Sequence, residues 1–210
     1  MRQGLAIVLV GGAFAFCGGD KQADLDHPPA LDVFVWDAQA SKTAANLKDA
    51  GWRQTADSEG RLEFEATRSA DPETERIAAT AGLPDAPPAD ANITLFSQAD
   101  QLNVVRMQRR GNRDAIRAFV SDLADDFEVE GPVWESEPRE TNSATGNRTT
   151  RREQLFETPR AWIAVRMVFT EAAEAQLSEA SISEVELQFF GKSTNEGLSQ
   201  GALVESLQAE

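Results

Sequence analysis

The chain has 210 residues, of which 41% are hydrophobic, and its 35 acidic residues against 20 basic ones give a formal net charge of −15. This size and apolar content allow a sizeable core and exclude a wholly disordered chain. The negative charge disfavours nucleic acid and anionic lipid as partners of the body of the protein, and no nucleic acid is expected to bind.

The first twenty residues, MRQGLAIVLVGGAFAFCGGD, have the three-part layout of an export signal. Arg2 and the terminal amino group form a positive start, residues 5–16 are apolar, and a polar stretch follows. The apolar run is well short of the roughly 20 residues that a membrane-spanning helix needs. Residues 1–16 are therefore expected to be a signal peptide. The alternative, a buried N-terminal helix or strand, is disfavoured by three glycines.

The sequence of this signal is compatible with two alternative cleavage sites. Residues 13–15, Ala-Phe-Ala, suit ordinary cleavage before Phe16 and release of a soluble protein. The sole cysteine, Cys17, ends the apolar run, and this segment resembles the signal of bacterial lipoproteins, in which cleavage falls just before a lipidated cysteine. That family has Gly, Ala or Ser before the cysteine, whereas Phe16 stands there. The resemblance implies lipid on Cys17 and, with Gly18 after it, sorting to the outer membrane of a Gram-negative cell.

A tether and four elements are predicted in the next part of the chain. The tether covers residues 17–30 and ends at a stiff His-Pro-Pro, and the domain covers residues 31–190. Apolar spacing and terminal residues predict a strand at 31–36, a helix at 38–51, a hairpin at 52–67 and a short helix at 71–82. The proline-rich stretch 83–91 indicates a subdivision between two halves.

The second half begins with a hairpin at 92–108 and contains the strongest helix prediction. This helix runs from Arg113 to Phe127, because its apolar residues fall on one face and Asn112 is a natural N-cap. Further on, the sequence predicts two strands around a polar tip at 131–157, a central apolar strand at 161–169, a helix at 171–178 and a strand at 183–190. Residues 191–210 are expected to be a C-terminal tail or one short helix.

These elements predict an α+β fold, in which an antiparallel β-sheet is covered by helices on one face. The alternative is a pair of ferredoxin-like halves. It rests on the similar order of elements after residues 31–36 and 102–107, with Leu31 in phase with Leu102 and Val33 with Val104.

Few patterns point to a cofactor or to catalysis. Residues 190–194, FGKST, end like a phosphate-binding loop, but Glu186 occupies the place of its first glycine, so no nucleotide is expected. His27 is the only histidine, which leaves no histidine cluster for zinc and no Ser-His pair, so no metal or cofactor is predicted. Acid pairs such as Asp125 and Asp126 usually form a solvated face. The four tryptophans are expected to anchor the core, with an exposed sugar- or peptide-binding platform as the alternative.

One stretch, residues 106–117, departs from the acidic background. Five arginines lie in it: Arg106, Arg109, Arg110, Arg113 and Arg117. Together with backbone N–H groups at Gly111 and Asn112, they form a candidate site for an anion or an acidic partner. A second cluster, with the same alternatives, is Arg148, Arg151 and Arg152. The alternative is that these arginines only pair with surplus carboxylates and aid solubility.

The sequence thus predicts an exported, lipid-anchored protein of the bacterial envelope that faces the periplasm. Its α+β domain is expected to bind another envelope protein rather than to catalyse a reaction. One alternative is a hydrolase or carbohydrate-active enzyme, which would bring two or three acids with raised pKa values together in a pocket. The other is a small-ligand carrier, which would enclose an apolar cavity.

Overall fold

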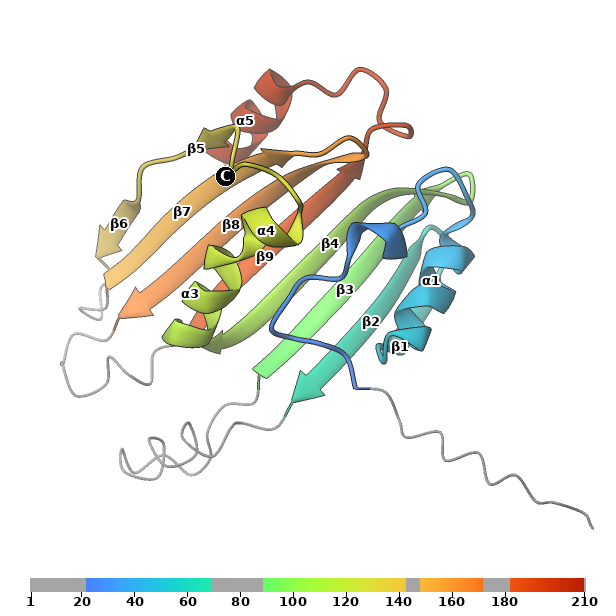
Figure 1. Cartoon of the computed structure of the whole chain (residues 1–210), viewed down its shortest axis with the longest axis horizontal. Helices are drawn as coiled ribbons and strands as arrows, with labels where there is room; N and C mark the ends of the chain where they lie inside the picture. The colour runs from blue at the N-terminus through green and yellow to red at the C-terminus, as the bar shows by residue number, and fades with distance from the viewer. Residues whose placement is uncertain (1–21, 69–88, 143–147, 172–181, 210) are drawn as a thin grey trace, which may run out of the picture.

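The computed structural model describes residues 22–68, 89–142, 148–171 and 182–209, which form an α+β fold around one antiparallel sheet (Figure 1). The strands are β1 (Arg53–Ser58), β2 (Arg61–Arg68), β3 (Ala89–Gln98), β4 (Gln101–Asn112), β5 (Trp134–Glu135), β6 (Arg139–Asn142), β7 (Arg148–Glu157), β8 (Ala161–Glu171) and β9 (Ile182–Gly191). Their order is β1-β2-β3-β4-β9-β8-β7-β5, and β6 also pairs with β7.

Tight turns join the early strands, as the sequence predicts for 52–67 and 92–108. Gly60 takes a positive φ of 74° in the β1–β2 turn. Ala99 and Asp100 take φ values of 50° and 65° between β3 and β4, the two positive angles of a type I′ hairpin turn. The strand predicted at 183–190 is β9, and the apolar strand at 161–169 is β8, which lies between β9 and β7.

Helices cover the sheet on one face and, at one end, on the other. They are α1 (Ala40–Asp49), α3 (Arg113–Ser121), α4 (Leu123–Asp126) and α5 (Gln200–Ala209), with a 3-10 turn η1 (Leu31–Val33). In Figure 1, α1, α3 and α4 lie in front of the sheet, and the main core forms between them and alternate residues of the strands. Members of this core include Ile93, Val105, Met107, Val165, Val185, Leu187 and Phe189.

The helix predicted over 113–127 is divided in two at Asp122, between α3 and α4. The Ser121 hydroxyl bonds back to the Ala118 carbonyl oxygen at 2.7 Å, a contact that competes with the regular helical hydrogen bonds. The predicted core-facing residues are nevertheless buried: Ile116, Phe119, Leu123 and Phe127.

The prediction of a strand at 31–36 is wrong. This segment forms η1 and then irregular chain, although Phe34 and Trp36 are buried as its apolar pattern indicates. Its backbone makes hydrogen bonds within η1, from Val33 to the Ala30 carbonyl oxygen and from Phe34 to that of Leu31, and further ones with α1. The Thr43 hydroxyl accepts one from it at 2.9 Å, and the Asn46 amide donates one to it at 3.0 Å. Strand propensity here reflects burial and not pairing.

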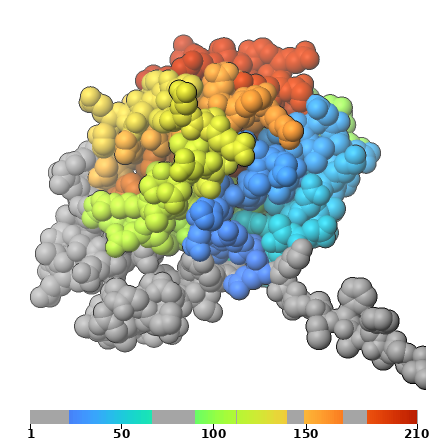
Figure 2. All heavy atoms as spheres, viewed as in Figure 1, coloured from blue at the N-terminus to red at the C-terminus, as the bar shows by residue number. Residues whose placement is uncertain are grey.

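The described part of the predicted tether, residues 22–30, is packed against the domain. Ala23 and Leu25 belong to the main core, and His27 Nδ1 lies 3.0 Å from Asp126 Oδ1 on α4. Burial raises the pKa of the Asp126 carboxyl, and the neighbouring His27 opposes that rise. We call residues 22–36 the N-terminal strap; Figure 2 shows it seated between α1 and the α3–α4 pair. The domain therefore begins at Ala23 or earlier, which corrects the tether boundary.

The expected C-terminal tail also belongs to the domain. Its helix α5 buries Leu203 and Leu207 against Leu155 and Ala164, which project from the face of the sheet opposite the main core. Two tryptophans, Trp134 and Trp162, pack partly buried in this second cluster, and Trp36 and Trp52 lie in the main core. All four tryptophans therefore anchor hydrophobic clusters, as predicted.

The chain repeats one order of elements, but the halves are not ferredoxin-like. A helix followed by a meander of antiparallel strands occurs first as α1 with β1–β4 and again as α3–α4 with β6–β9. The last strands of the two halves, β4 and β9, pair at the middle of the sheet. Within each half, successive strands are hydrogen-bonded neighbours, whereas a ferredoxin-like half interleaves the strands of two split βαβ units. The helix predicted at 71–82 and the tip at 143–147 lie outside the described residues, as do 172–178 of the helix predicted at 171–178 and 83–88 of the boundary predicted at 83–91. Glu171 instead ends β8, and residues 89–91 begin β3.

Gly191, the last residue of β9, packs directly against Trp36 of the strap. A methyl group on Gly191 would lie 2.5 Å from Trp36 Cε3. We expect Gly191→Ala to lower the free energy of unfolding by about 2 kcal/mol in urea titrations. Gly201→Ala on α5 is the matched control, because a methyl group there meets nothing closer than 3.9 Å and alanine favours a helix. Equal stability of the two variants would contradict this packing.

Candidate functional site

The face of the sheet opposite α1, α3 and α4, here called the open face, carries rows of polar side chains. Side chains alternate between the two faces along each strand, so residues between the core positions project from this face. The antiparallel register aligns one residue from each of several strands across it. This polar row consists of Arg53, Glu65, Asn92, Gln108, Glu186, Arg166 and Glu153.

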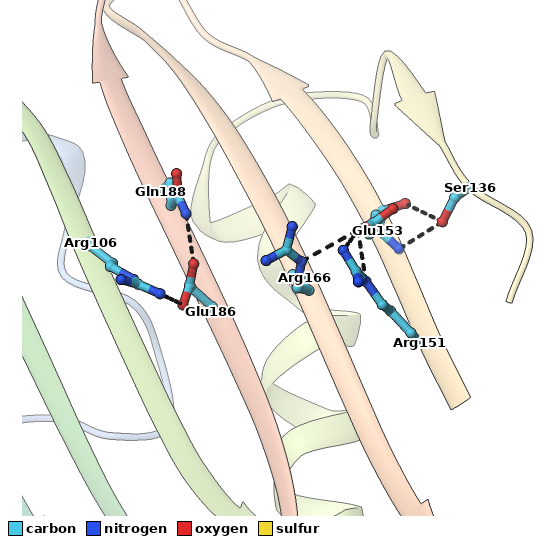
Figure 3. Close-up of polar contacts among 7 residues, drawn as sticks. All are labelled: Arg106, Ser136, Arg151, Glu153, Arg166, Glu186 and Gln188. Carbon is cyan, nitrogen blue, oxygen red and sulfur yellow. Dashed lines mark hydrogen bonds and ion pairs between the residues drawn. The ribbon is translucent and has the colours of Figure 1, made fainter. Parts of the chain in front are cut away.

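Glu186, on β9, lies near the middle of the polar row and is almost fully buried (Figure 3). Its Oε2 accepts hydrogen bonds from Arg106 at 2.5 Å and from Gln108 at 2.8 Å, both on β4. Its Oε1 accepts one from Gln188 at 2.6 Å. Burial alone would raise the pKa of Glu186, but these three hydrogen bonds outweigh it and hold that pKa below its ordinary value. The carboxylate is thus a fixed, ionised acceptor.

The lowered pKa of Glu186 predicts a dependence of stability on pH. The folded state holds the charged form better than the unfolded chain does, so its contribution is complete above the ordinary pKa of about 4.5 and is lost as pH falls through the lower folded value. Between about pH 6 and about pH 3.5, the wild type should therefore lose more stability than Glu186→Gln in urea unfolding. Glu184→Gln, which removes a more exposed carboxylate from the same strand, is the control. Parallel pH profiles for wild type and Glu186→Gln would contradict this role.

Glu153, on β7, is the most deeply buried member of the row, with 1% of its surface exposed. Its Oε1 accepts hydrogen bonds from Arg151 at 2.9 and 2.6 Å and from Arg166 at 3.3 Å (Figure 3). Its backbone N–H donates to the Ser136 hydroxyl at 2.9 Å. Its other oxygen, Oε2, accepts no hydrogen bond from the described part of the chain. The two arginines therefore compensate this charge inside the protein.

On the β1–β4 side of the open face, arginine is the outer partner of each ion pair. The side chain of Arg106 is 43% exposed and that of Glu186 is 10% exposed. The corresponding fractions are 58% for Arg110 and 35% for Glu184. The same order holds for two further pairs, Arg53 with Glu65 and Arg61 with Glu63. Guanidinium groups thus form the outer layer of this face.

The structure divides the predicted arginine site between the two faces of the sheet. Arg106 and Arg110 lie together on the open face, with their pairing carboxylates on β9. Arg109 points the opposite way and is buried, with its guanidinium 4.8 Å from the centre of the Phe119 ring. It also donates to the Ala115 carbonyl oxygen on α3 at 3.1 Å. Arg109 is therefore a structural residue of the helix–sheet contact.

The other predicted arginines are also separated. Arg113 and Arg117 lie on α3, where Arg117 stands over the Phe169 ring at 5.8 Å. In the second cluster, Arg151 projects from the open face and Arg152 from the other, where it pairs with Glu135. The side chain of Arg148 is outside the described residues. No single anion site gathers the five arginines of residues 106–117.

The glycine–lysine turn after β9 makes local contacts. Lys192 Nζ lies 2.8 Å from Glu157 and 4.8 Å from the Trp162 ring centre.

Two open hollows lie on the described surface, of about 540 and about 660 Å³, and Lys192 lines the larger one. Their linings include Asp57, Glu59, Asp100, Glu128, Glu130 and Glu157. Both are acidic and open to solvent, unlike the closed apolar cavity that a small-ligand carrier would have.

Sequence reasoning missed the buried carboxylates. Glu186 was considered only as the residue that excludes a phosphate-binding loop, and Glu153 was not singled out. Each occupies the polar phase of an alternating strand, where exposure is the ordinary expectation. Their burial depends on which strands become neighbours, and a single strand carries no signal of that.

No family model, curated protein or solved structure matches this chain. Within the described ranges, no helix is long and apolar enough to cross a membrane. In the same ranges, no three His, Cys, Asp or Glu side chains converge in a way that could hold a metal ion. The open face, with its row of polar side chains and its network of ion pairs, is therefore the candidate functional surface of the described chain.

Proposed function

We propose that this protein is exported to the bacterial envelope, anchored in the outer membrane through lipid on Cys17, and binds another envelope protein without catalysing a reaction. Residues 1–21 lie outside the described chain, so support for export and lipidation comes from sequence: the sole cysteine ends an apolar run that follows a positive start. Support for binding comes from one observation, the outward guanidinium groups of the open face.

The carboxylate chemistry of the open face favours binding over hydrolysis. An acid catalyst needs a carboxyl group whose pKa is raised towards the working pH. The pKa of Glu186 is instead lowered by its hydrogen-bond donors. Glu153 is held by two arginines and is almost inaccessible to a substrate. These two residues suit a fixed polar framework better than a catalytic pair.

Attachment through Cys17 would hold the domain close to the bilayer. Because Ala23 and Leu25 are packed in the core, only residues 18–22 separate the cysteine from the domain. An extended chain spans at most about 3.6 Å per residue, so this connection reaches about 20 Å. The partner would then be met at the membrane surface and not across the periplasm.

Expression of the full chain in a Gram-negative host with labelled fatty acid tests the anchor. The wild type should incorporate label and partition to membranes, and Cys17→Ser should do neither. Ala13→Gln, which disrupts the Ala-Phe-Ala pattern further from the cysteine, should be labelled like the wild type. Unlabelled protein in the periplasm with Phe16 at its N-terminus would overturn the lipoprotein assignment.

A further inference from the structure

We propose that the β1–β4 side of the open face is the docking surface, and that its occupant is a different protein whose own patch presents carboxylates to these guanidinium groups. This inference rests on the proposed binding function and narrows it to one surface and one chemistry. The surface, here called the arginine surface, is defined by Arg53, Arg61, Arg106 and Arg110, with Asn92 and Gln108 between them.

The guanidinium groups of this surface keep donors for a second carboxylate. Arg110 binds Glu184 through Nε at 3.2 Å, and Arg106 binds Glu186 through one terminal nitrogen. A guanidinium group has five N–H donors, and its terminal nitrogens bind carboxylates in a bidentate manner. The carboxylates beneath hold the arginine side chains in place, which lowers the entropy lost when a partner binds.

Charge is distributed unevenly between the two sides of the molecule. The opposite side, formed by the strap and the α3–α4 region, carries more acidic than basic residues: Asp24, Asp26, Asp32, Asp114, Asp122, Asp125 and Asp126 lie there, against Arg109, Arg113 and Arg117. A carboxylate-bearing partner would be repelled by that side. The arginine surface is thus the side on which such a partner finds complementary groups.

The shape and charge of the surface favour a protein over other occupants. Four neighbouring strands, at about 4.8 Å spacing, make a broad face that suits a macromolecule better than a small ligand. A polyanion such as a nucleic acid is disfavoured, because its evenly spaced phosphates would also meet the carboxylates beneath these arginines, whereas a protein patch can place its carboxylates over the guanidinium groups alone. A second copy of the chain is disfavoured, because two chains of net charge −15 repel each other at long range.

A carbohydrate is also disfavoured, because cations lie against two aromatic rings of this face. The guanidinium of Arg61 lies 5.9 Å from the centre of the Phe96 ring, and Lys192 covers Trp162. Sugar binding by stacking needs such rings to be free. Arginine set among amide side chains is instead typical of protein interfaces.

Photocrosslinking of the full chain in its native host tests the surface. A benzophenone amino acid replaces Asn92, within the arginine surface, or Ala45, exposed on α1. We expect a discrete protein adduct from position 92 only, with an aspartate or glutamate in the crosslinked peptide. Arg53→Glu with Arg110→Glu should lower its yield by about tenfold. Lys42→Glu with Lys48→Glu on α1, an equal change in charge, should leave the yield unchanged.

A second pair of variants guards against misfolding. Arg53→Gln with Arg110→Gln places no new negative charge beside the carboxylates that pair with these arginines, so its thermal midpoint should stay near that of the wild type. The yield of the adduct from position 92 should still fall. An adduct from Ala45 but none from Asn92 would overturn the surface and leave partner binding intact, whereas no adduct from either position would overturn both. An adduct with a second copy, or one that resists protease digestion, would overturn the assignment of the occupant. Fatty-acid labelling in the same cells reports separately on the anchor.

Discussion

Glu153→Leu should lower the free energy of unfolding by about 3–5 kcal/mol, because it leaves two half-buried guanidinium groups without their shared carboxylate. Both arginines bond to Oε1 of Glu153, and their side chains are only 23% exposed for Arg151 and 19% for Arg166. Water therefore cannot fully replace the lost partner. Urea unfolding followed by tryptophan fluorescence measures the difference.

Glu184→Leu is the matched control for that change. It makes the same substitution on the open face of β9, which is separated from β7 by β8. The ion-pair partner of Glu184, Arg110, is mostly exposed. Solvent can take over that guanidinium, so the loss should stay below about 1 kcal/mol. Glu153→Gln, which keeps a hydrogen-bond acceptor of the same shape, should fall between the two. Similar losses for both leucine variants would show that Glu153 is not buried as described.

The strands that carry the open face were predictable from local patterns. Residues 92–108 and 183–190 alternate between apolar and polar side chains and are bounded by turns, and they form β3, β4 and β9. The same two-residue period also separates Arg109 from Arg106 and Arg110. The predicted five-arginine site ignored that period, and this is why the structure divides it.

Other features depend on pairings that no local pattern encodes. The burial of Glu153 requires β7 to lie beside β8, with Arg166 in register across from it. Residues 31–36 have the composition of a strand, but their backbone makes its hydrogen bonds within η1 and with α1. In the strap, Leu25 is an isolated apolar residue among acids, so nothing nearby in sequence indicates that it is buried.

Leu25→Ala should lower the free energy of unfolding by about 3 kcal/mol, because the leucine is 1% exposed and its removal leaves a cavity beneath the strap. A flexible tether ending at residue 30 predicts no change at all, so this variant separates the two descriptions. Asp32→Ala, at an exposed position of the same strap, should change stability by less than about 0.5 kcal/mol. Urea unfolding of the three proteins provides the measurement. Equal midpoints would show that residues 22–30 are a flexible tether and not part of the packed domain.

If lipid on Cys17 anchors the protein as proposed, the position of Leu25 also sets how far the domain can move from the bilayer. With Leu25 in place, the domain includes Ala23, and the residues that connect it to Cys17 can span at most about 20 Å when extended. If Leu25→Ala releases the strap as far as His27 and its contact with Asp126, the same connection gains several residues. The domain could then stand roughly 15 Å further from the bilayer. A core leucine would in this way determine the layer of the envelope in which the arginine surface meets its partner.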